Sequence, residues 1–316
     1  MNPKIVTIGD LTADIVMPVK LPIAPGDSQQ IPWYRVEPGG AGNFLLAGQR
    51  LGAQMIALGA LGDDLFGRYV LDVLRDEGVN VEGIAISTQV PTTMVAVLFE
   101  PDAGKFSYVW HGGGGETLTL SPAAMHSIDQ GDALFMQGFT LCEASLHPLV
   151  DYALASGKPI WYDVGPATKY IPDPDRARIR EHTYALLTTE DELPTIANGL
   201  TGQAAYDFLL DVGSQLLVIK RGELGCRVIS HSGQIDVPGF TVTVRDLVGA
   251  GDSFNAAFIY GTLCGLTLQE AAILANAAGG AKVQKLGTGR AMPTRAEIAA
   301  VLAAAGVSVG IDLDAE

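Results

Sequence analysis

The sequence predicts an α/β fold, in which a mostly parallel sheet lies between layers of helices. Short apolar runs bounded by turn residues alternate with helix-like segments along most of the 316 residues, as in sheets whose parallel strands are connected by helices. These runs are almost continuously apolar, which is typical of strands covered on both faces. Two segments, residues 11–36 and 91–111, break the alternation and have the pattern of paired strands.

The alternation starts at the N-terminus. Residues 4–9 and 55–61 are apolar runs that indicate strands, and residues 42–51 indicate a helix between them. Within residues 64–77, apolar side chains recur at helical spacing, so a second helix is predicted there. Further strands are predicted at residues 133–136, 159–163, 185–188, 216–220 and 240–244.

The two exceptional segments each contain two strand-like pieces. Strands are predicted at Ala13–Val19 and Gln30–Val36, and again at Thr92–Phe99 and Lys105–Trp110, where Pro101–Gly104 predicts the connecting turn. Four such strands can form one small sheet or two independent hairpins, and the pattern leaves both open. The four glycines at 112–115 fit a hinge, a close approach to a ligand, or a plain surface loop.

Composition narrows the class of protein. Apolar residues make up 48% of the chain, charged residues 17%, and the formal net charge is −15. A surface this acidic disfavours nucleic acid and anionic membranes as partners. The three cysteines are widely spaced, without a zinc-ligand pattern. The sequence opens directly on a strand and has no apolar run long enough to span a bilayer, so we expect a cytoplasmic protein without a signal peptide.

The segment Asp246–Phe258 carries the most chemical information. Gly249 and Gly251 precede an apolar helix, and glycines there allow a tight turn that exposes successive backbone amides to an anion. Asp252 stands beside these amides and can accept a proton from an attacking hydroxyl, as phosphoryl transfer requires. The alternative is a carboxylate that only caps the helix. A Walker A motif is absent, and the glycines lack the third member of the dinucleotide fingerprint.

Three motifs together resemble those of the ribokinase-like, or PfkB, family of carbohydrate kinases. Asp246–Asp252 is similar to the family's D-T-x-G-A-G-D signature, with Leu247 in place of the usual Thr. Residues 39–53 resemble its N-terminal glycine-pair signature, and residues 59–67 its G-x-x-G-x-D-x-x-G segment. The motifs occur in the family's order, and the resemblance covers nearly the whole chain.

The resemblance implies a ribokinase-like three-layer α/β/α core with a mostly parallel sheet, plus a small β-sheet lid. The core would comprise residues 1–10, 37–90 and 112–316, and the lid residues 11–36 and 91–111. It also implies an ATP-dependent carbohydrate kinase that uses Mg²⁺, and it leaves a monovalent cation such as K⁺ open. The family often forms dimers through the lid, so a homodimer is expected.

The family's catalytic and substrate residues match positions in this sequence. Asp252 would be the base, and Gly249, Ala250 and Gly251 would form the anion hole. The substrate positions are Asp14, Gly39, Gly40 and Asn43. A carboxylate such as that of Asp14 can accept hydrogen bonds from two neighbouring hydroxyls, and glycines let the backbone approach a sugar. Asp14 in a strand-start turn and Asn43 as a helix cap are the alternatives.

The family's nucleotide positions match Lys220, Gly222, Gly225, Asn276 and Gly287. Glu192 matches a glutamate that organises Mg²⁺ through water, although Thr189 stands where the family often has Asn. Asp163-Val164-Gly165-Pro166 departs from the family's D-P-N-x-R pattern, which weakens any transfer of substrate identity.

Three functions remain open from the sequence. The first is a kinase of a sugar-like substrate, and few cations near the lid favour a neutral one. The second is a nucleoside kinase of the same family, which aromatic lid residues such as Trp33, Tyr108 and Trp110 would also suit. The third is a non-catalytic regulatory protein that binds nucleotide or sugar, against which the presence of Asp252 argues.

Overall fold

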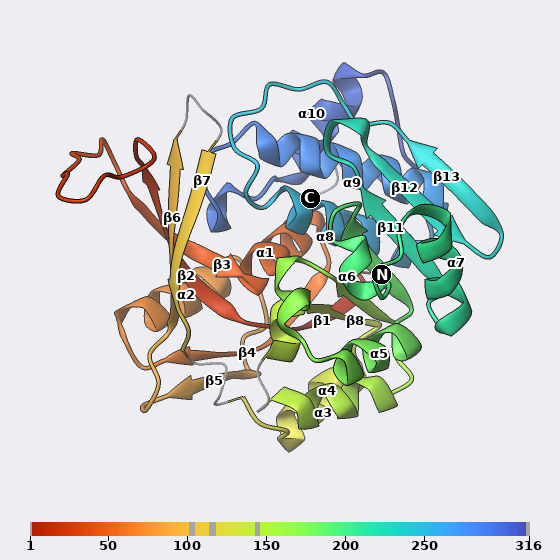
Figure 1. The fold of residues 1–316 in the computed structure, drawn as a ribbon, viewed down its shortest axis with the longest axis horizontal. Coiled ribbons are helices and arrows are strands. Elements are labelled where there is room, and N and C mark those ends of the chain that lie inside the picture. The colour runs from red at the N-terminus through yellow and green to blue at the C-terminus, as the bar shows by residue number, and fades with distance from the viewer. Residues whose placement is uncertain (1, 101–104, 114–117, 143–145, 314–316) are drawn as a thin grey trace.

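The computed structural model describes residues 2–100, 105–113, 118–142 and 146–313. It confirms the α/β fold, with a nine-stranded sheet in the order β13-β12-β11-β10-β9-β8-β1-β4-β5 (Figure 1). Neighbouring strands from β11 to β5 are parallel, and the hairpin β12–β13 adds antiparallel strands at one edge. The strands are β1 (Lys4–Ile8), β4 (Gln54–Gly62), β5 (Ile84–Ser87), β8 (Ala133–Gln137), β9 (Ile160–Asp163), β10 (Ala185–Thr189), β11 (Leu216–Lys220), β12 (Cys226–Ser230) and β13 (Gly233–Val237).

Helices cover both faces of this sheet, because alternate strand residues point to opposite sides. Ile5 and Phe135 pack in one core, whereas Val6 and Leu134 pack in the other. One face carries α1 (Ala41–Leu51), α2 (Leu65–Asp76), α8 (Ala250–Leu263), α9 (Leu268–Val283) and α10 (Arg295–Ala304). The other carries α3 (Pro122–Gln130), α4 (His147–Ala155), α5 (Asp173–His182), α6 (Leu193–Ile196) and α7 (Gly202–Val212) (Figure 1).

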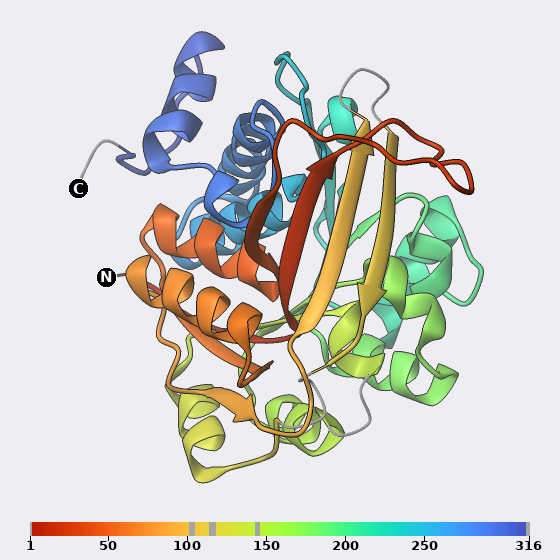
Figure 2. The same ribbon diagram turned by 90° about the vertical axis from the view of Figure 1, so that its left-hand side faces the viewer.

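The two exceptional segments form one small sheet, in the order β3-β2-β6-β7. Its strands are β2 (Leu11–Pro18), β3 (Arg35–Gly40), β6 (Thr93–Glu100) and β7 (Lys105–His111), and they stand side by side in Figure 2. Parallel pairing between β2 and β6 joins the two pieces, so they are not independent hairpins. The predicted turn at 101–104 and two of the four glycines at 112–115 lie outside the described residues.

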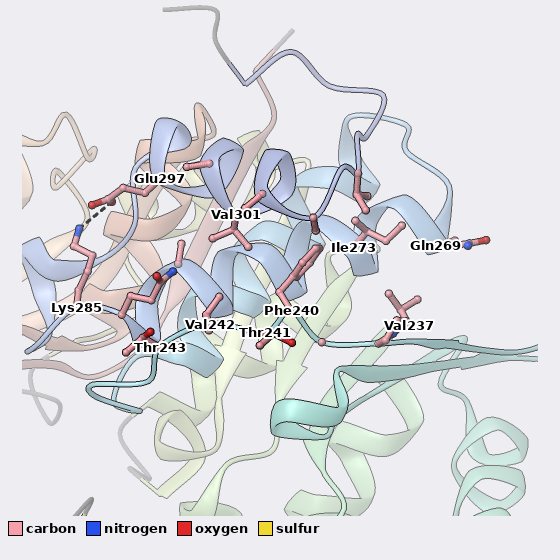
Figure 3. Close-up of a pocket in the computed structure, with 18 of the residues that line it drawn as sticks. Val237, Phe240, Thr241, Val242, Thr243, Gln269, Ile273, Lys285, Glu297 and Val301 are labelled. Atoms are coloured by element: carbon pink, nitrogen blue, oxygen red, sulfur yellow. Dashed lines mark hydrogen bonds and ion pairs between the residues drawn. The ribbon is translucent and has the colours of Figure 1, made fainter. Parts of the chain in front are cut away.

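Two predicted strands were wrong. The strand expected at Gln30–Val36 lies instead at Arg35–Gly40, where the glycine pair continues the strand and pairs with Thr12 and Leu11. The alternating pattern at residues 240–244 does not reflect a strand. Phe240 and Val242 pack against α9 beside Gly280, so a helix surface rather than a sheet produces the apolar alternation (Figure 3). The hairpin β12–β13 and strand β5 were not predicted.

Among the described residues, no helix has the length and apolar character needed to cross a membrane.

Candidate active site

The candidate site lies at the carboxyl ends of four neighbouring parallel strands. Gln137, Asp163, Thr189 and Lys220 are the last residues of β8, β9, β10 and β11. Register pairs Gln137 with Asp163, and Thr189 with Lys220, so these polar side chains follow one another along one edge. Ligands of open α/β sheets bind at this edge, because there the loops leave the strands towards solvent.

The N-terminus of α8 supplies backbone donors next to that edge. Gly249 precedes the helix with φ 81°, a conformation that favours glycine. A Cβ atom at Gly249 would also lie 2.5 Å from the Cε atom of Met292, so a side chain has no room there. The first turn of α8 contains Ala250, Gly251 and Asp252. The Ala250 amide donates to the Leu247 carbonyl oxygen over 3.2 Å. The helix dipole and the amides that a first helical turn leaves without an intrahelical partner make this turn favourable for negative charge.

Asp252 is held by side chains from other elements. Gln137 Nε2 donates a hydrogen bond of 2.9 Å to Asp252 Oδ1, and the Asn43 amide also stabilises the charged carboxylate. Withdrawal from water raises the pKa of Asp252 to about 7, and the negative charge of Asp163 contributes to this rise. Lys220 opposes it. A carboxyl group with a pKa near neutrality is suited to general base catalysis.

Lys220 lies between the strand edge and the anion-binding turn. Its Nζ donates to Asp163 Oδ1 over 2.6 Å, and both side chains are largely buried. A Cβ atom at Gly251 would be 3.7 Å from the Lys220 Nζ atom. The Lys220 ammonium therefore stands beside the first turn of α8.

Asp14 occupies the adjoining part of the site, on β2. Its side chain is 5% exposed and accepts a hydrogen bond of 2.8 Å from Thr12 Oγ1. Burial raises the pKa of Asp14 to about 6, and Glu37 adds to this effect, while the hydroxyls of Thr12 and Thr288 oppose it. A Cβ atom at Gly39 would lie 1.9 Å from Asp14 Oδ1, so the carboxylate takes the space that only a glycine leaves.

The loop around Gly289 links the two carboxylates. The Gly289 amide donates to Asn43 Oδ1 over 2.8 Å, and Asn43 in turn reaches Asp252. The preceding residue, Thr288, faces Asp14. The structure therefore brings Asp14, Asn43 and Asp252, which are far apart in sequence, into one connected site.

Gly40 has a different role in the site. It precedes α1 with φ 54°, and a Cβ atom there would lie 2.5 Å from the carbonyl oxygen of Asp10. Gly40 therefore permits a tight junction between β3 and α1, which places Asn43 on the first turn of that helix.

The carboxylate of Asp246 holds the loop that precedes α8. Asp246 is buried; its Oδ1 accepts from the Val248 amide over 2.9 Å, and its Oδ2 accepts from the Gly287 amide over 2.7 Å. Gly287, a predicted nucleotide position, thus uses its amide to join the loop after α9 to the loop before α8.

The other predicted nucleotide positions surround one backbone segment. Gly222 and Gly225 have φ values of 58° and 83°, and a Cβ atom at Gly225 would lie 2.1 Å from the Val237 carbonyl oxygen. Asn276 Nδ2 donates to the carbonyl oxygens of Val237 and Pro238 over 3.2 and 3.1 Å. Asn276 therefore holds the chain after β13 against the loop that follows Lys220.

Glu192 is positioned by a reciprocal pair of hydrogen bonds. The Thr189 amide donates to Glu192 Oε2 over 3.0 Å, and the Glu192 amide donates to Thr189 Oγ1 over 3.3 Å. The Thr189 hydroxyl thus performs a local role that an Asn side chain could also fill. The described residues contain no cluster of three or more His, Cys, Asp or Glu side chains placed for a metal.

A cavity of about 930 Å³ borders the segment after β13 (Figure 3). It is bounded by the segment after β13, by α9 and by α10, with Phe240, Val242 and Val301 among its lining residues. Its lining includes neither Asp252 nor Lys220 nor Asn276. We therefore do not place the chemistry in this cavity.

Several residues of the site were not predicted from the sequence. Gln137 is a single polar residue at the end of an apolar strand, and only that position marked it. Asp163 matched the first residue of the family's D-P-N-x-R pattern, but no role was assigned to it. Glu37 is buried beside Asp14 and pairs with Arg290 at 3.0 Å. Lys282 is buried beneath Gly249. The small residues around it in the sequence did not indicate that its side chain would be buried.

Comparison with known proteins gives concordant matches over nearly the whole chain. A sequence model described as pfkB family carbohydrate kinase matches residues 2–295. The chain is 29% identical over 303 residues to a ribokinase of Bacillus subtilis (strain 168), covering 95% of this chain and 99% of that protein. It is 27% identical to a probable fructokinase-4 of Arabidopsis thaliana, covering 94% and 96%.

Solved structures support the same fold. Arabidopsis thaliana ribokinase in complex with ribose and ATP superposes with a TM-score of 0.81 at 22% identity, covering 96% of this chain and 99% of that one. A putative ribokinase II from E. coli in complex with ATP and Mg²⁺ gives a TM-score of 0.84 at 22% identity, with the same coverage. A Burkholderia thailandensis nucleoside kinase in complex with inosine gives 0.77 at 22% identity, covering 97% and 99%.

Proposed function

The chain belongs to the pfkB family of carbohydrate kinases, and on that premise we propose that it transfers the γ-phosphoryl group of ATP to a hydroxyl of a small, neutral sugar. The observation that carries the proposal is the position of Asp252. Its carboxylate, with a pKa of about 7, lies in the first turn of α8, and the Lys220 ammonium lies next to the same turn.

Each side chain then has a chemical task. Asp14 accepts hydrogen bonds from sugar hydroxyls and orients the sugar. Asp252 accepts the proton of the attacking hydroxyl as the oxygen–phosphorus bond forms and ADP leaves. The amides of Gly249, Ala250 and Gly251 and the ammonium of Lys220 stabilise the charge on the transferring phosphoryl group. When bound, Mg²⁺ neutralises charge on the nucleotide phosphates, and Glu192 would hold it through water.

We assign the loop after Lys220 to the nucleotide. Gly222 and Gly225 let the backbone turn tightly beside the strand edge, and Asn276 keeps the segment after β13 against that turn. Gly287 supports the same region through Asp246. These contacts shape one wall along which ATP would extend towards Gly251.

The small sheet is proposed to act as a lid formed by residues 11–36 and 91–111 over a core of residues 1–10, 37–90 and 112–316. Asp14 lies on β2 of this sheet, and β3 continues the sheet through Gly39 into the residues assigned to the core. Movement of the sheet would therefore close the site and exclude water. Tyr108 on β7 is 55% exposed, and partial burial together with the charges of Asp246 and Asp14 raises its pKa. Trp33 instead packs with Phe99 in the sheet's own core.

A homodimer through this sheet is part of the proposal. Large apolar side chains are exposed on its strands and beside them, and Trp110 is 71% exposed. Exposed aromatic residues at a sheet edge favour burial against a second subunit. The exposed set, apart from Tyr108, is Tyr34, Val109 and Trp110.

A nucleoside kinase is the second candidate. Tyr108 can stack on a nucleobase as well as on the apolar face of a sugar, and the related Burkholderia nucleoside kinase is described in complex with inosine. The site itself contains the same base and anion-binding turn in either case.

The test of the proposal is ADP release from Mg-ATP with a panel of neutral sugars, sugar acids, sugar phosphates and nucleosides. We expect strong stimulation by a neutral sugar. Stimulation by nucleosides alone would transfer the assignment to the second candidate. ATP binding without stimulation by any acceptor would contradict the proposed kinase activity.

The pKa of Asp252 predicts the pH dependence of turnover. Protonated Asp252 cannot accept a proton, so kcat/KM should fall tenfold per unit as pH decreases below about 7. Replacement Asp163→Asn removes a negative neighbour and frees the charge of Lys220, and both changes lower the pKa of Asp252. The acid limb should therefore move to lower pH, by about one unit.

The control for this pH profile is Asp207→Asn, which removes a carboxylate from exposed helix α7, where it contacts only Gln203 among described side chains. Its acid limb should match that of the wild type. An acid limb that stays in place or moves upward in Asp163→Asn would contradict the assignment of Asp252.

A further inference from the structure

Lys282 is a lysine with no exposed surface. It is the penultimate residue of α9, its exposure is 0%, and its Nζ donates to the carbonyl oxygen of Lys285 over 3.3 Å. Burying an ammonium group is costly unless neighbouring groups compensate its charge. A methionine or leucine would fill the same space without that cost, so the charge itself calls for an explanation.

The surroundings of Lys282 lie directly under the anion-binding turn. A Cβ atom at Gly249 would be 3.3 Å from Lys282 Cε, so the lysine stem supports the residue that precedes α8. Burial, with the positive charge of Lys285, lowers the pKa of Lys282 to about 8, whereas the negative charges of Asp246 and Asp252 favour its protonated form. At neutral pH the ammonium is therefore largely charged.

The ammonium lies where two loops meet. Asp246 holds the first loop through the Val248 amide and the second through the Gly287 amide. Lys282 contributes its contact with the Lys285 carbonyl oxygen on the second loop and its packing against Gly249 on the first. A positive charge here draws the Asp246 carboxylate and the Lys285 carbonyl towards one point, and so fixes the spacing of the two loops.

We propose that Lys282 is a positioning residue that supplies, from within the chain, the fixed cation that holds the Asp246–Gly251 loop in its anion-binding shape. This inference rests on the proposed kinase function and deepens it. Because the charge is built in, turnover needs no added monovalent cation. Removing the side chain leaves a small site with a carboxylate and a carbonyl oxygen, which are oxygen ligands suited to K⁺ or NH₄⁺.

Two substitutions separate charge from volume. Lys282→Ala opens the site, whereas Lys282→Met removes the charge but fills most of the space. Both should lower kcat about 10- to 100-fold, because small displacements of the transition-state donors are costly. At constant ionic strength, K⁺ or NH₄⁺ should restore most of the activity of Lys282→Ala but not of Lys282→Met. Wild-type activity should not respond to K⁺, NH₄⁺ or Na⁺ relative to tetramethylammonium.

The matched control is Lys158→Ala, which removes a lysine from the loop before β9. This loop lies at the amino end of β9, whereas Asp163 lies at its carboxyl end. It should behave as the wild type in every salt. The proposal is overturned if Lys282→Ala and Lys282→Met keep wild-type kcat, if no cation restores Lys282→Ala, or if the wild type itself requires K⁺.

Thermal unfolding gives a readout that does not depend on turnover. Without substrate, K⁺ or NH₄⁺ should raise the Tm of Lys282→Ala, because a ligand that binds the folded state stabilises it. The Tm of the wild type and of Lys282→Met should not respond. An equal response of all three proteins would contradict the inference. If the wild type phosphorylates no acceptor, the kinase proposal fails, and the Tm comparison still decides whether a cation site replaces Lys282.

Discussion

Replacement of Asp252 by Asn is expected to lower kcat by about 10²- to 10⁴-fold, the usual contribution of a general base. The amide has the shape of the carboxylate and can still accept the hydrogen bond from Gln137, but it cannot take the proton of the attacking hydroxyl. ATP binding should persist, because the amides of Gly249–Gly251 and Lys220 remain. The measurement is steady-state turnover, together with nucleotide binding by calorimetry.

Asp207→Asn on α7 serves as the control for this variant too, since it makes the same chemical change on the surface. It should keep wild-type kcat. Unchanged turnover in Asp252→Asn would remove Asp252 from the mechanism. Loss of both turnover and ATP binding would show instead that the carboxylate maintains the shape of the turn.

Replacement of Gly39 by Ala should be nearly as damaging, although it adds one carbon atom. Its Cβ would lie 1.9 Å from Asp14 Oδ1 and 2.1 Å from Asp14 Cγ, so the carboxylate must move. The sugar would lose charge-assisted hydrogen bonds that contribute about 1.5–3 kcal/mol each. We expect kcat/KM for the sugar to fall about a hundredfold or more, while the KM for ATP stays close to that of the wild type.

Gly280→Ala is the matched glycine substitution. A Cβ atom there meets only ordinary contacts of 3.7 Å or longer within α9, where Ala is the better helix former. Its kinetics should be those of the wild type. If Gly39→Ala also retained wild-type kcat/KM, Asp14 would not be the residue that orients the sugar.

Much of the large sheet could be predicted because buried parallel strands have short apolar sequences bounded by turn residues. The runs at 133–136, 185–188 and 216–220 correspond to β8, β10 and β11. The prediction failed where apolar alternation had another cause. Phe240 and Val242 pack on a helix. The Gly39-Gly40 pair lies within β3, where Asp14 occupies the space of a side chain at position 39 and the Asp10 carbonyl oxygen that of a side chain at position 40.

The candidate site was predictable only in part, for a physical reason. Asp252 and its glycines lie in one short segment, so their arrangement is a local property of the turn and the helix start. The partners of Asp252 come from elsewhere: Gln137 ends β8, and Asn43 belongs to α1. The burial of Lys282 likewise depends on how α9 packs beneath Gly249, which no local pattern expresses.

The most direct test of the central claim follows the γ-phosphoryl group itself. Wild-type protein and Asp252→Asn are incubated with γ-labelled Mg-ATP and the sugar that stimulates ADP release, and label is measured in sugar phosphate and in inorganic phosphate. We predict that the wild type places the label in the sugar and that Asp252→Asn forms almost none of this product. Label confined to inorganic phosphate, or equal sugar labelling by both proteins, would contradict the account.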